Sequence, residues 1–227
     1  MFDILKKLIA LFMLTLLLTS CSSVPFEYAD YEALESSMEL KAHNPAPWKK
    51  ITLQTNMVIE YPFYSTSVIC MMQYDGKAMH LAAMLPAGVK FMEISGTPEK
   101  PEMYYFMPGF IADKNKQQKM AEALLQDFSR IFLNERFLYP GQIPGSEIKR
   151  CTCGVVMTLP GQGEKRFYGS RKLRLMKKAV KNEDCNWQSE YFRCTVNKGM
   201  IYPDRIVYTN KTNGYRLILR VHDFQAE

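Results

Sequence analysis

The chain has 227 residues, with 29 Lys and Arg against 23 Asp and Glu, and a formal net charge of +6 at pH 7. That length is enough for one domain with a proper core. The mild excess of basic residues would suit work beside anionic lipid, but it does not by itself select a partner.

The first twenty residues have the features of an export signal. Lys6 and Lys7 form a short basic segment, and residues 8–18 form an apolar run that is broken only by Thr15. The run is long enough for the core of a signal peptide and short for a membrane span. We therefore predict that residues 1–20 are a signal peptide. Nucleic acid is not an expected partner of an exported chain.

The residues that follow suggest how the mature protein is anchored. Leu18-Thr19-Ser20-Cys21 resembles the lipobox of bacterial lipoprotein signal peptides. The resemblance implies cleavage before Cys21 and lipidation of its thiol, so that acyl chains, palmitate among them, tether the protein to the membrane. Ser22 follows the cysteine, which in enterobacterial lipoproteins implies the outer membrane, here its periplasmic side. The alternative is an ordinary secretory signal in which Cys21 has no role.

The remaining cysteines fit an oxidising compartment. Cys70 lies in an apolar run and is predicted to be a core residue. Cys151, Cys153, Cys185 and Cys194 could form two disulfides, with the connectivity open. Free thiols and a metal site are the alternatives. The Cys-x-Cys spacing of the first pair is tight for structural zinc, so no metal is expected.

The chain then changes character from tether to folded domain. Residues 21–47 are predicted to be an acylated N-terminus and tether, and residues 48–227 a single domain. Strand-length runs rich in β-branched, aromatic and Met residues are separated by Pro, Gly and Asp, as in a meander. In the first half of the domain these runs cover residues 51–61, 64–74, 78–85, 89–95 and 102–107.

One helix is predicted in the middle of the domain, over Asp113–Leu133. Asp113 is a suitable N-cap, and the apolar residues behind it repeat every three or four positions. The most regular members of this stripe are Met120, Leu124, Phe128 and Ile131.

Strands resume in the second half, over residues 151–159, 165–176, 188–196, 205–209 and 215–224. Asn213-Gly214 is a strong hairpin signal before the last of them. That strand alternates apolar residues with Arg216, Arg220 and His222, which predicts a sheet with one apolar and one wet face. The fold class is therefore mainly β (α+β): a strongly curved antiparallel sheet or incomplete β-barrel with a helical lid.

Three segments of the domain carry a resemblance to a known family. The strand–Pro-x-Gly–strand sequence of residues 81–94, the helix that follows it, and the hairpin of residues 203–224 resemble LolB-like outer-membrane lipoproteins of the LolA/LolB superfamily. A related group of outer-membrane lipoproteins, found beside aryl-polyene and fatty-acid synthesis genes, shares this layout. The resemblance covers roughly residues 48–224 and matches least over residues 142–194.

The resemblance implies an apolar cavity for acyl chains below a helical lid. Residues of the inner helix face would line this cavity, namely Met120, Leu124, Phe128 and Ile131. The turn of Leu85, Pro86, Ala87 and Gly88 would form the membrane-delivery loop. The family has an exposed Leu between the Pro and the Gly of this turn, whereas this chain has Ala87, which places membrane insertion in doubt.

The motifs do not favour an enzyme. His43, His80 and His222 show no metal-ligand spacing, and the sequence contains no Gly-x-Ser-x-Gly elbow. We predict a lipid-binding lipoprotein with a transport or chaperone role, which takes an acyl chain or a lipoprotein as cargo and needs no cofactor. The alternative is an anchored structural or protein-interaction module of the cell envelope without lipid cargo. The sequence does not indicate an oligomeric state.

Overall fold

The computed structural model describes residues 32–33, 49–133, 145–151, 154–161, 163–169, 175–197 and 200–227. The chain divides into two compact units, residues 1–31 and 32–227, and all described residues belong to the second. The predicted signal peptide, Cys21 and most of the predicted tether lie outside the described residues, as does Cys153.

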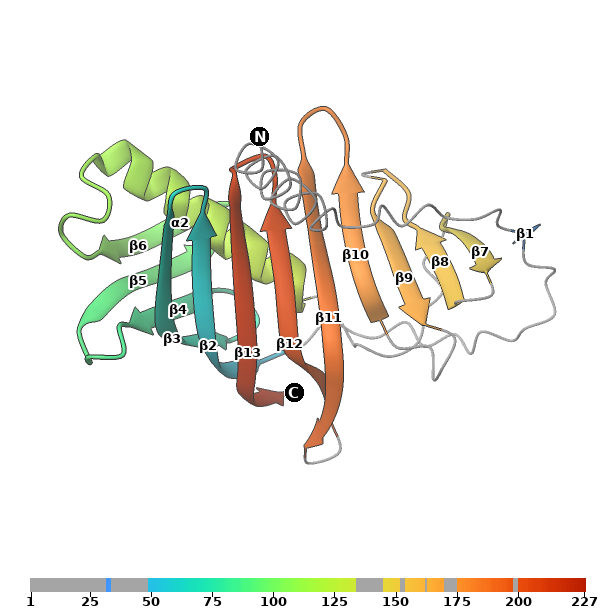
Figure 1. Ribbon diagram of the computed structural model, residues 1–227, viewed down its shortest axis with the longest axis horizontal. Helices are drawn as coiled ribbons and strands as arrows, with labels where there is room; N and C mark the ends of the chain where they lie inside the picture. The colour runs from blue at the N-terminus through green and yellow to red at the C-terminus, as the bar shows by residue number, and fades with distance from the viewer. Residues whose placement is uncertain are drawn as a thin grey trace, which may run out of the picture. The chain divides into compact units, whose positions relative to one another are not determined.

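Within the described residues, thirteen strands form one antiparallel sheet (Figure 1). The five strands that precede the helix are β2 (Ile51–Tyr61), β3 (Tyr64–Tyr74), β4 (Met79–Met84), β5 (Lys90–Thr97) and β6 (Lys100–Phe106). The others are β1 (Glu32–Ala33), β7 (Glu147–Cys151), β8 (Gly154–Thr158), β9 (Lys165–Gly169), β10 (Leu175–Lys181), β11 (Asn186–Asn197), β12 (Met200–Asn210) and β13 (Tyr215–Ala226).

The strand order shows how the chain builds the sheet. The order is β1-β7-β8-β9-β10-β11-β12-β13-β2-β3-β4-β5-β6, so each half is a meander and β13 returns to pair with β2. The order ends at β1 and at β6, which leaves the barrel open. Register shifts in the pairs β13–β2 and β5–β6 mark bulges, which bend a sheet. Gly96 at the second bulge has φ +140°, and a Cβ there would lie 2.5 Å from the Lys100 carbonyl oxygen.

The sheet has one apolar face, as the alternation in its last strand predicts. In β13 the side chains of Tyr215, Leu217 and Leu219 are buried, whereas those of Arg216 and Arg220 are exposed. β2 alternates in the same way over its first eight residues. The buried side chains of both halves form one core cluster.

The predicted helix is present as α2 (Lys114–Phe128), continued by one π-helical turn, η1 (Ser129–Leu133). Asp113 is its N-cap, and Oδ1 of Asp113 accepts a hydrogen bond from the backbone N–H of Lys116 at 2.8 Å. Because β6 and β7 lie near opposite ends of the strand order, the connection between them crosses the sheet, and Figure 1 shows α2 passing behind β2 and β13. Among the described residues, no helix is long and apolar enough to span a membrane.

The predicted strands fail mainly between residues 147 and 181. β7 was not predicted, because its sequence Glu-Ile-Lys-Arg-Cys offers one large aliphatic side chain and it forms by pairing with β8 and β1. The run predicted over residues 151–159 shrinks to β8. The run predicted over 165–176 covers β9 and only the first two residues of β10, which continues to Lys181. Pairing partners decide the boundaries of such mixed polar strands.

Candidate functional site

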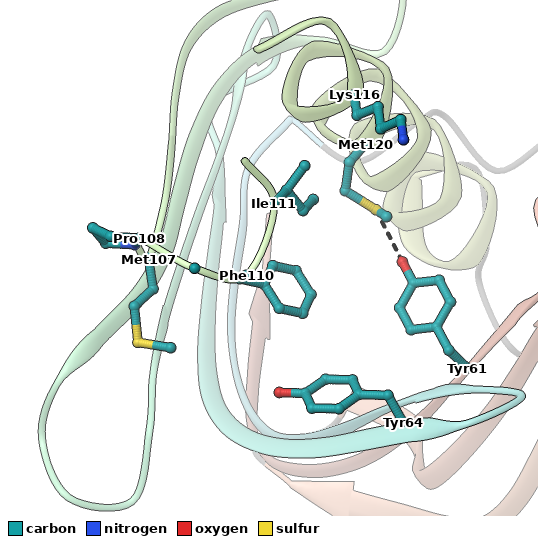
Figure 2. Close-up of a pocket in the computed structure, with 9 residues that line it drawn as sticks. Tyr61, Tyr64, Met107, Pro108, Phe110, Ile111, Lys116 and Met120 are labelled. Atoms are coloured by element: carbon teal, nitrogen blue, oxygen red, sulfur yellow. Dashed lines mark hydrogen bonds between the residues drawn. The ribbon is translucent and has the colours of Figure 1, made fainter. Parts of the chain in front are cut away.

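A pocket of about 690 Å³ lies where α2 begins (Figure 2). Three segments enclose it: the β2–β3 hairpin, the loop between β6 and α2, and the first two turns of α2. Its lining is mainly aromatic, aliphatic and thioether side chains. The lining residues are Tyr61, Tyr64, Met107, Pro108, Gly109, Phe110, Ile111, Lys116 and Met120.

Phe110 is the central side chain of this pocket. Its ring packs against Phe91 at 4.7 Å between centroids and against Tyr64 at 6.0 Å. The backbone N–H of Phe110 donates to the Met107 carbonyl at 3.1 Å, and Gly109 between them has φ +87°. A left-handed residue is needed to turn the chain back here, and glycine adopts that conformation without strain.

The loop is also fixed to the helix that follows it. The side-chain amide of Gln117 donates a hydrogen bond to the Ile111 carbonyl at 2.7 Å. This bond satisfies a backbone acceptor that leaves the sheet just before the helix begins. The pocket wall is therefore held from both sides.

Three residues with polar side-chain groups line the pocket: Tyr61, Tyr64 and Lys116. The Tyr61 hydroxyl donates to the Met120 sulfur at 3.4 Å, which is a weak acceptor. Burial, helped by the charge of Asp127, raises the pKa of Tyr61 to about 12, so the hydroxyl remains a donor at neutral pH. Lys116 is the charged lining residue, and Figure 2 shows it on the helix beyond Met120, away from Tyr64.

A buried carboxylate lies behind the pocket, where α2 ends. Asp127 is fully buried, and it accepts hydrogen bonds from the hydroxyls of Tyr208, at 2.5 Å, and Tyr215. Asn210 donates to it at 3.2 Å and Arg130 at 3.0 Å. Burial raises the pKa of Asp127, and the four partners oppose that rise. Because these groups satisfy one another, the network joins α2 to β12 and β13.

Arg130 extends this network to β11. Its guanidinium lies 5.3 Å from the centroid of the Trp187 ring, and Nη2 donates to the Cys185 sulfur at 3.4 Å. The backbone carbonyl of Arg130 accepts a hydrogen bond from the ammonium of Lys178 on β10. The end of the helix is thus attached to the four strands β10, β11, β12 and β13 by side chains that the sequence pattern does not single out.

The structure separates the four predicted cavity residues. Met120 lines the pocket, whereas Leu124, Phe128 and Ile131 lie in the core cluster with exposed fractions of 2% or less. These three residues are not among those that line the described pocket, because α2 packs directly on the sheet at their positions. A polar substitution at Leu124 or Phe128 would therefore test folding before it tested binding.

The predicted membrane-delivery loop is a tight turn between β4 and β5. The Gly88 N–H donates to the Leu85 carbonyl at 2.8 Å, and Gly88 has φ +80°. Leu85 is half-buried against the core, while Pro86 and Ala87 are exposed. Met84 and Val89, on either side of this turn, are large apolar side chains exposed at 41% and 51%. A role in delivery stays a prediction.

Cys70 and Cys185 are free thiols in the structure. Cys70 is fully buried, as predicted, and burial raises its pKa to about 12. The side chains of Cys151 and Cys194 lie outside the described residues. Disulfides among Cys151, Cys153, Cys185 and Cys194 therefore stay a prediction.

The sequence did not single out the aromatic residues of the site. Tyr61 ends one predicted strand, Tyr64 begins the next, and Phe110 follows a Pro-Gly turn. Phe63, between those strands, is fully exposed at the hairpin tip. A large apolar residue in a two-residue turn was the available signal, since turns usually hold Gly, Asn, Asp or Pro.

No family model matches the chain, and no curated protein does. Among solved structures, it is similar to a LolA superfamily protein from Nitrosomonas europaea, with 10% identity, a TM-score of 0.48, and coverage of 83% of this chain and 91% of that one. It is also similar to a domain described as an outer-membrane lipoprotein-sorting protein from Vibrio parahaemolyticus (10% identity, TM-score 0.44, coverage 83% and 89%).

A third similar structure is a DUF1329 family protein from Desulfovibrio piger (10% identity, TM-score 0.45, coverage 79% and 86%). The first of the three bears the name of the superfamily that the sequence layout resembles. At TM-scores below 0.5 these likenesses do not assign the chain to a family, so its function has to be inferred from its own residues.

Proposed function

We propose that this chain is an outer-membrane-anchored lipoprotein whose domain binds an acyl chain, of a lipid or a lipoprotein, for transport or membrane delivery. The observation that carries the proposal is the pocket at the start of α2. Its volume of about 690 Å³ lies within the usual range for small-molecule sites, and its walls are Tyr, Phe, Met, Ile and Pro side chains.

The chemistry of the pocket suits an alkyl chain. Each buried methylene contributes about 0.8 kcal/mol, so a long chain gains enough to offset the cost of being ordered. Met107 and Met120 have flexible, polarizable side chains that can adjust to chains of different shape. The pocket is partly open to solvent, which allows an acyl chain to enter without unfolding the lid.

The surroundings of the pocket favour contact with a membrane. β2, β4 and β6 run in the same direction, so the turns after β2 and β4 and the loop after β6 lie at the same end of the sheet. Exposed apolar side chains mark this end, namely those of Phe63, Tyr64, Met84 and Val89. Together with a lipidated Cys21, these side chains would hold the pocket mouth close to lipid.

We propose that the domain binds its ligand without catalysing a reaction. Asp127, the fully buried carboxylate, is engaged by four hydrogen-bonding partners. A general acid or base has to reach a reacting group. A carboxylate whose partners all come from the protein is better suited to holding the lid on the sheet.

One observation favours the alternative, an anchored protein-interaction module. The outer face of β3–β6 exposes Met71, Met103 and Tyr105 at 39% to 44%, outside the pocket. Exposed apolar residues gathered on one face are typical of protein contacts. An interaction module would use this face and would leave the pocket empty.

Photolabelling distinguishes the two functions. Protein expressed from the full chain is reconstituted in lipid nanodiscs and exposed to a diazirine-bearing fatty acid, and labelled peptides are identified by mass spectrometry. We expect saturable labelling of residues 107–120. Phe110→Asp and Met120→Asp should abolish it, and Met103→Asp, on the outer face, should not.

Thermal unfolding establishes which variants are folded. Met120 is half-exposed, so its substitution keeps the test valid if Phe110→Asp does not fold. Labelling that never saturates, or that persists in folded Met120→Asp, would remove the acyl-binding function and leave the interaction module.

A further inference from the structure

The pocket has a charged end as well as an apolar one. Figure 2 shows Lys116 and Met120 on the helix, Tyr61 below them, and Phe110 and Tyr64 on the far side. The Lys116 ammonium and the Tyr61 hydroxyl thus lie near the helix, whereas the Phe110 ring and the ring and hydroxyl of Tyr64 lie farther from it. An alkyl chain alone would not need this polarity, but an amphiphile would.

Among the described residues, no acidic side chain forms an ion pair with the ammonium of Lys116. Three acidic groups lie within two residues of the lining and have other partners. The Glu122 carboxylate accepts a hydrogen bond from the side-chain amide of Gln118 at 3.0 Å. Asp113 caps the backbone of α2, and Glu60 pairs with Arg216 at 3.4 Å.

The helix itself adds to the positive potential. The first turn of α2 contains no acidic residue and begins with Lys114. Helix N-termini usually carry Asp or Glu, because the aligned peptide dipoles leave partial positive charge there. The Asp113 carboxylate at the N-cap offsets part of this charge, so the Lys116 ammonium supplies the main stabilisation of an anion beside it.

Tyr61 offers a donor in the same part of the pocket. Its hydroxyl donates its hydrogen bond to the Met120 sulfur at 3.4 Å. A carboxylate or phosphate oxygen is a far better acceptor than a thioether sulfur. Asp127 acts on Tyr61 from behind, but Arg130 lies 3.0 Å from that carboxylate and offsets its charge. A ligand anion would therefore meet donors from two sides.

We propose that the pocket selects acyl chains that end in an anionic group, with the Lys116 ammonium as counter-charge and the Tyr61 hydroxyl as hydrogen-bond donor. This inference rests on the acyl-binding function proposed above and adds the chemistry of the head group. A fatty-acid carboxylate and a lipid phosphate share that chemistry, and the competitors in the experiment separate them.

The test measures competition against the photoreactive fatty acid, in nanodiscs and below probe saturation. Three competitors with the same alkyl chain are used: laurate, dodecyl phosphate and dodecanol. Each partitions differently into lipid, but that partition is the same for every protein variant. The comparison between variants therefore isolates the contribution of the head group.

We expect Lys116→Gln to weaken competition by laurate and by dodecyl phosphate about fivefold at low salt, which is the size of one exposed charge interaction. Competition by dodecanol should be unchanged. Tyr61→Phe should also weaken only the anions. Lys114→Gln is the matched control, because it removes the same charge from the same turn outside the pocket lining. The anion whose competition is weakened more by Lys116→Gln identifies the preferred head group.

Two results would overturn the inference and leave acyl binding intact. One is that Lys116→Gln weakens competition by dodecanol as much as competition by laurate. The other is that the Lys114→Gln control weakens competition by the anions as much as Lys116→Gln does. If none of the three compounds competes in the wild-type protein, the acyl-binding function itself is overturned.

Discussion

The Tyr208 hydroxyl donates a 2.5 Å hydrogen bond to the carboxylate of Asp127, although 81 residues separate them in the chain. Tyr215 and Asn210 donate to the same carboxylate, so three side chains from two adjacent strands hold the end of α2. The lid is therefore fixed at this end by a polar contact, whereas the pocket lies at the other end.

Asp127→Ala should destabilise the domain by about 3–5 kcal/mol, because it leaves a guanidinium and three polar donors without their partner in a buried site. Urea unfolding followed by circular dichroism measures the change. Glu122→Ala, on the same helix and only half-buried, is the control and should change stability far less. Equal effects of the two substitutions would show that the network does not hold the helix.

The stability of the domain should also depend on the ionisation of Asp127. Because burial raises its pKa in the folded state, its contribution is fully present below 3.8, the ordinary pKa, and is lost as the pH rises through the folded-state pKa. The free energy of unfolding of the wild type, relative to Asp127→Asn, should fall over that window. A difference that grows with pH would mean that the hydrogen bonds outweigh burial.

Cys21→Ala should abolish acylation and leave a soluble or uncleaved protein, because the thiol is the group that the lipid modifies. Incorporation of labelled palmitate in the bacterial host measures this directly. Ser23→Ala, two residues away, is the control and should be labelled like the wild type. Palmitate in the Cys21→Ala protein would remove the lipoprotein prediction.

At least one disulfide should form within the set Cys151, Cys153, Cys185 and Cys194 in protein from the periplasm, while Cys70 stays reduced. Thiols are counted with an alkylating reagent before and after denaturation without reductant. Cys70 should react only after denaturation, since it is buried and its pKa is raised to about 12. Four or five reactive thiols in the denatured protein would contradict the disulfide.

Phe63→Ser should weaken binding of the protein to lipid vesicles severalfold and leave its stability unchanged, because the side chain is fully exposed in the fold. Co-sedimentation with vesicles measures binding, and a Cys21→Ala background removes the contribution of the acyl anchor. Met176→Ser removes an exposed apolar side chain from β10 and serves as the control. Equal loss in both variants would argue against a membrane role of the hairpin tip.

Leu85→Ala should slow transfer of a fluorescent acyl probe to acceptor vesicles more than it weakens binding of the probe. The turn of residues 85–88 lies at the same end of the sheet as Phe63, but Leu85 does not line the pocket. Stopped-flow transfer and equilibrium titration separate the two effects. Loss of binding in proportion to transfer would show that the turn acts through the pocket or the fold.

Much of the fold follows from local patterns. β2 and β3 have the predicted boundaries, because alternating side chains and the intervening Pro62 define a hairpin without help from the rest of the chain. The stripe behind Asp113 defined the helix for a similar reason, since its spacing repeats with the helical turn. The lipobox prediction, and with it the acylation of Cys21, depends on sequence alone and stays a prediction.

The location of the site was decided by tertiary structure. An apolar helix residue can face a cavity or a packed sheet, and the pattern is the same in both cases, so Leu124 and Phe128 could not be told from Met120 in advance. The curvature of the sheet and the path of α2 bring Tyr61, Phe110 and Met120 together, and they place Asp127 against β12 and β13. These contacts join residues far apart in the chain, and no local pattern encodes them.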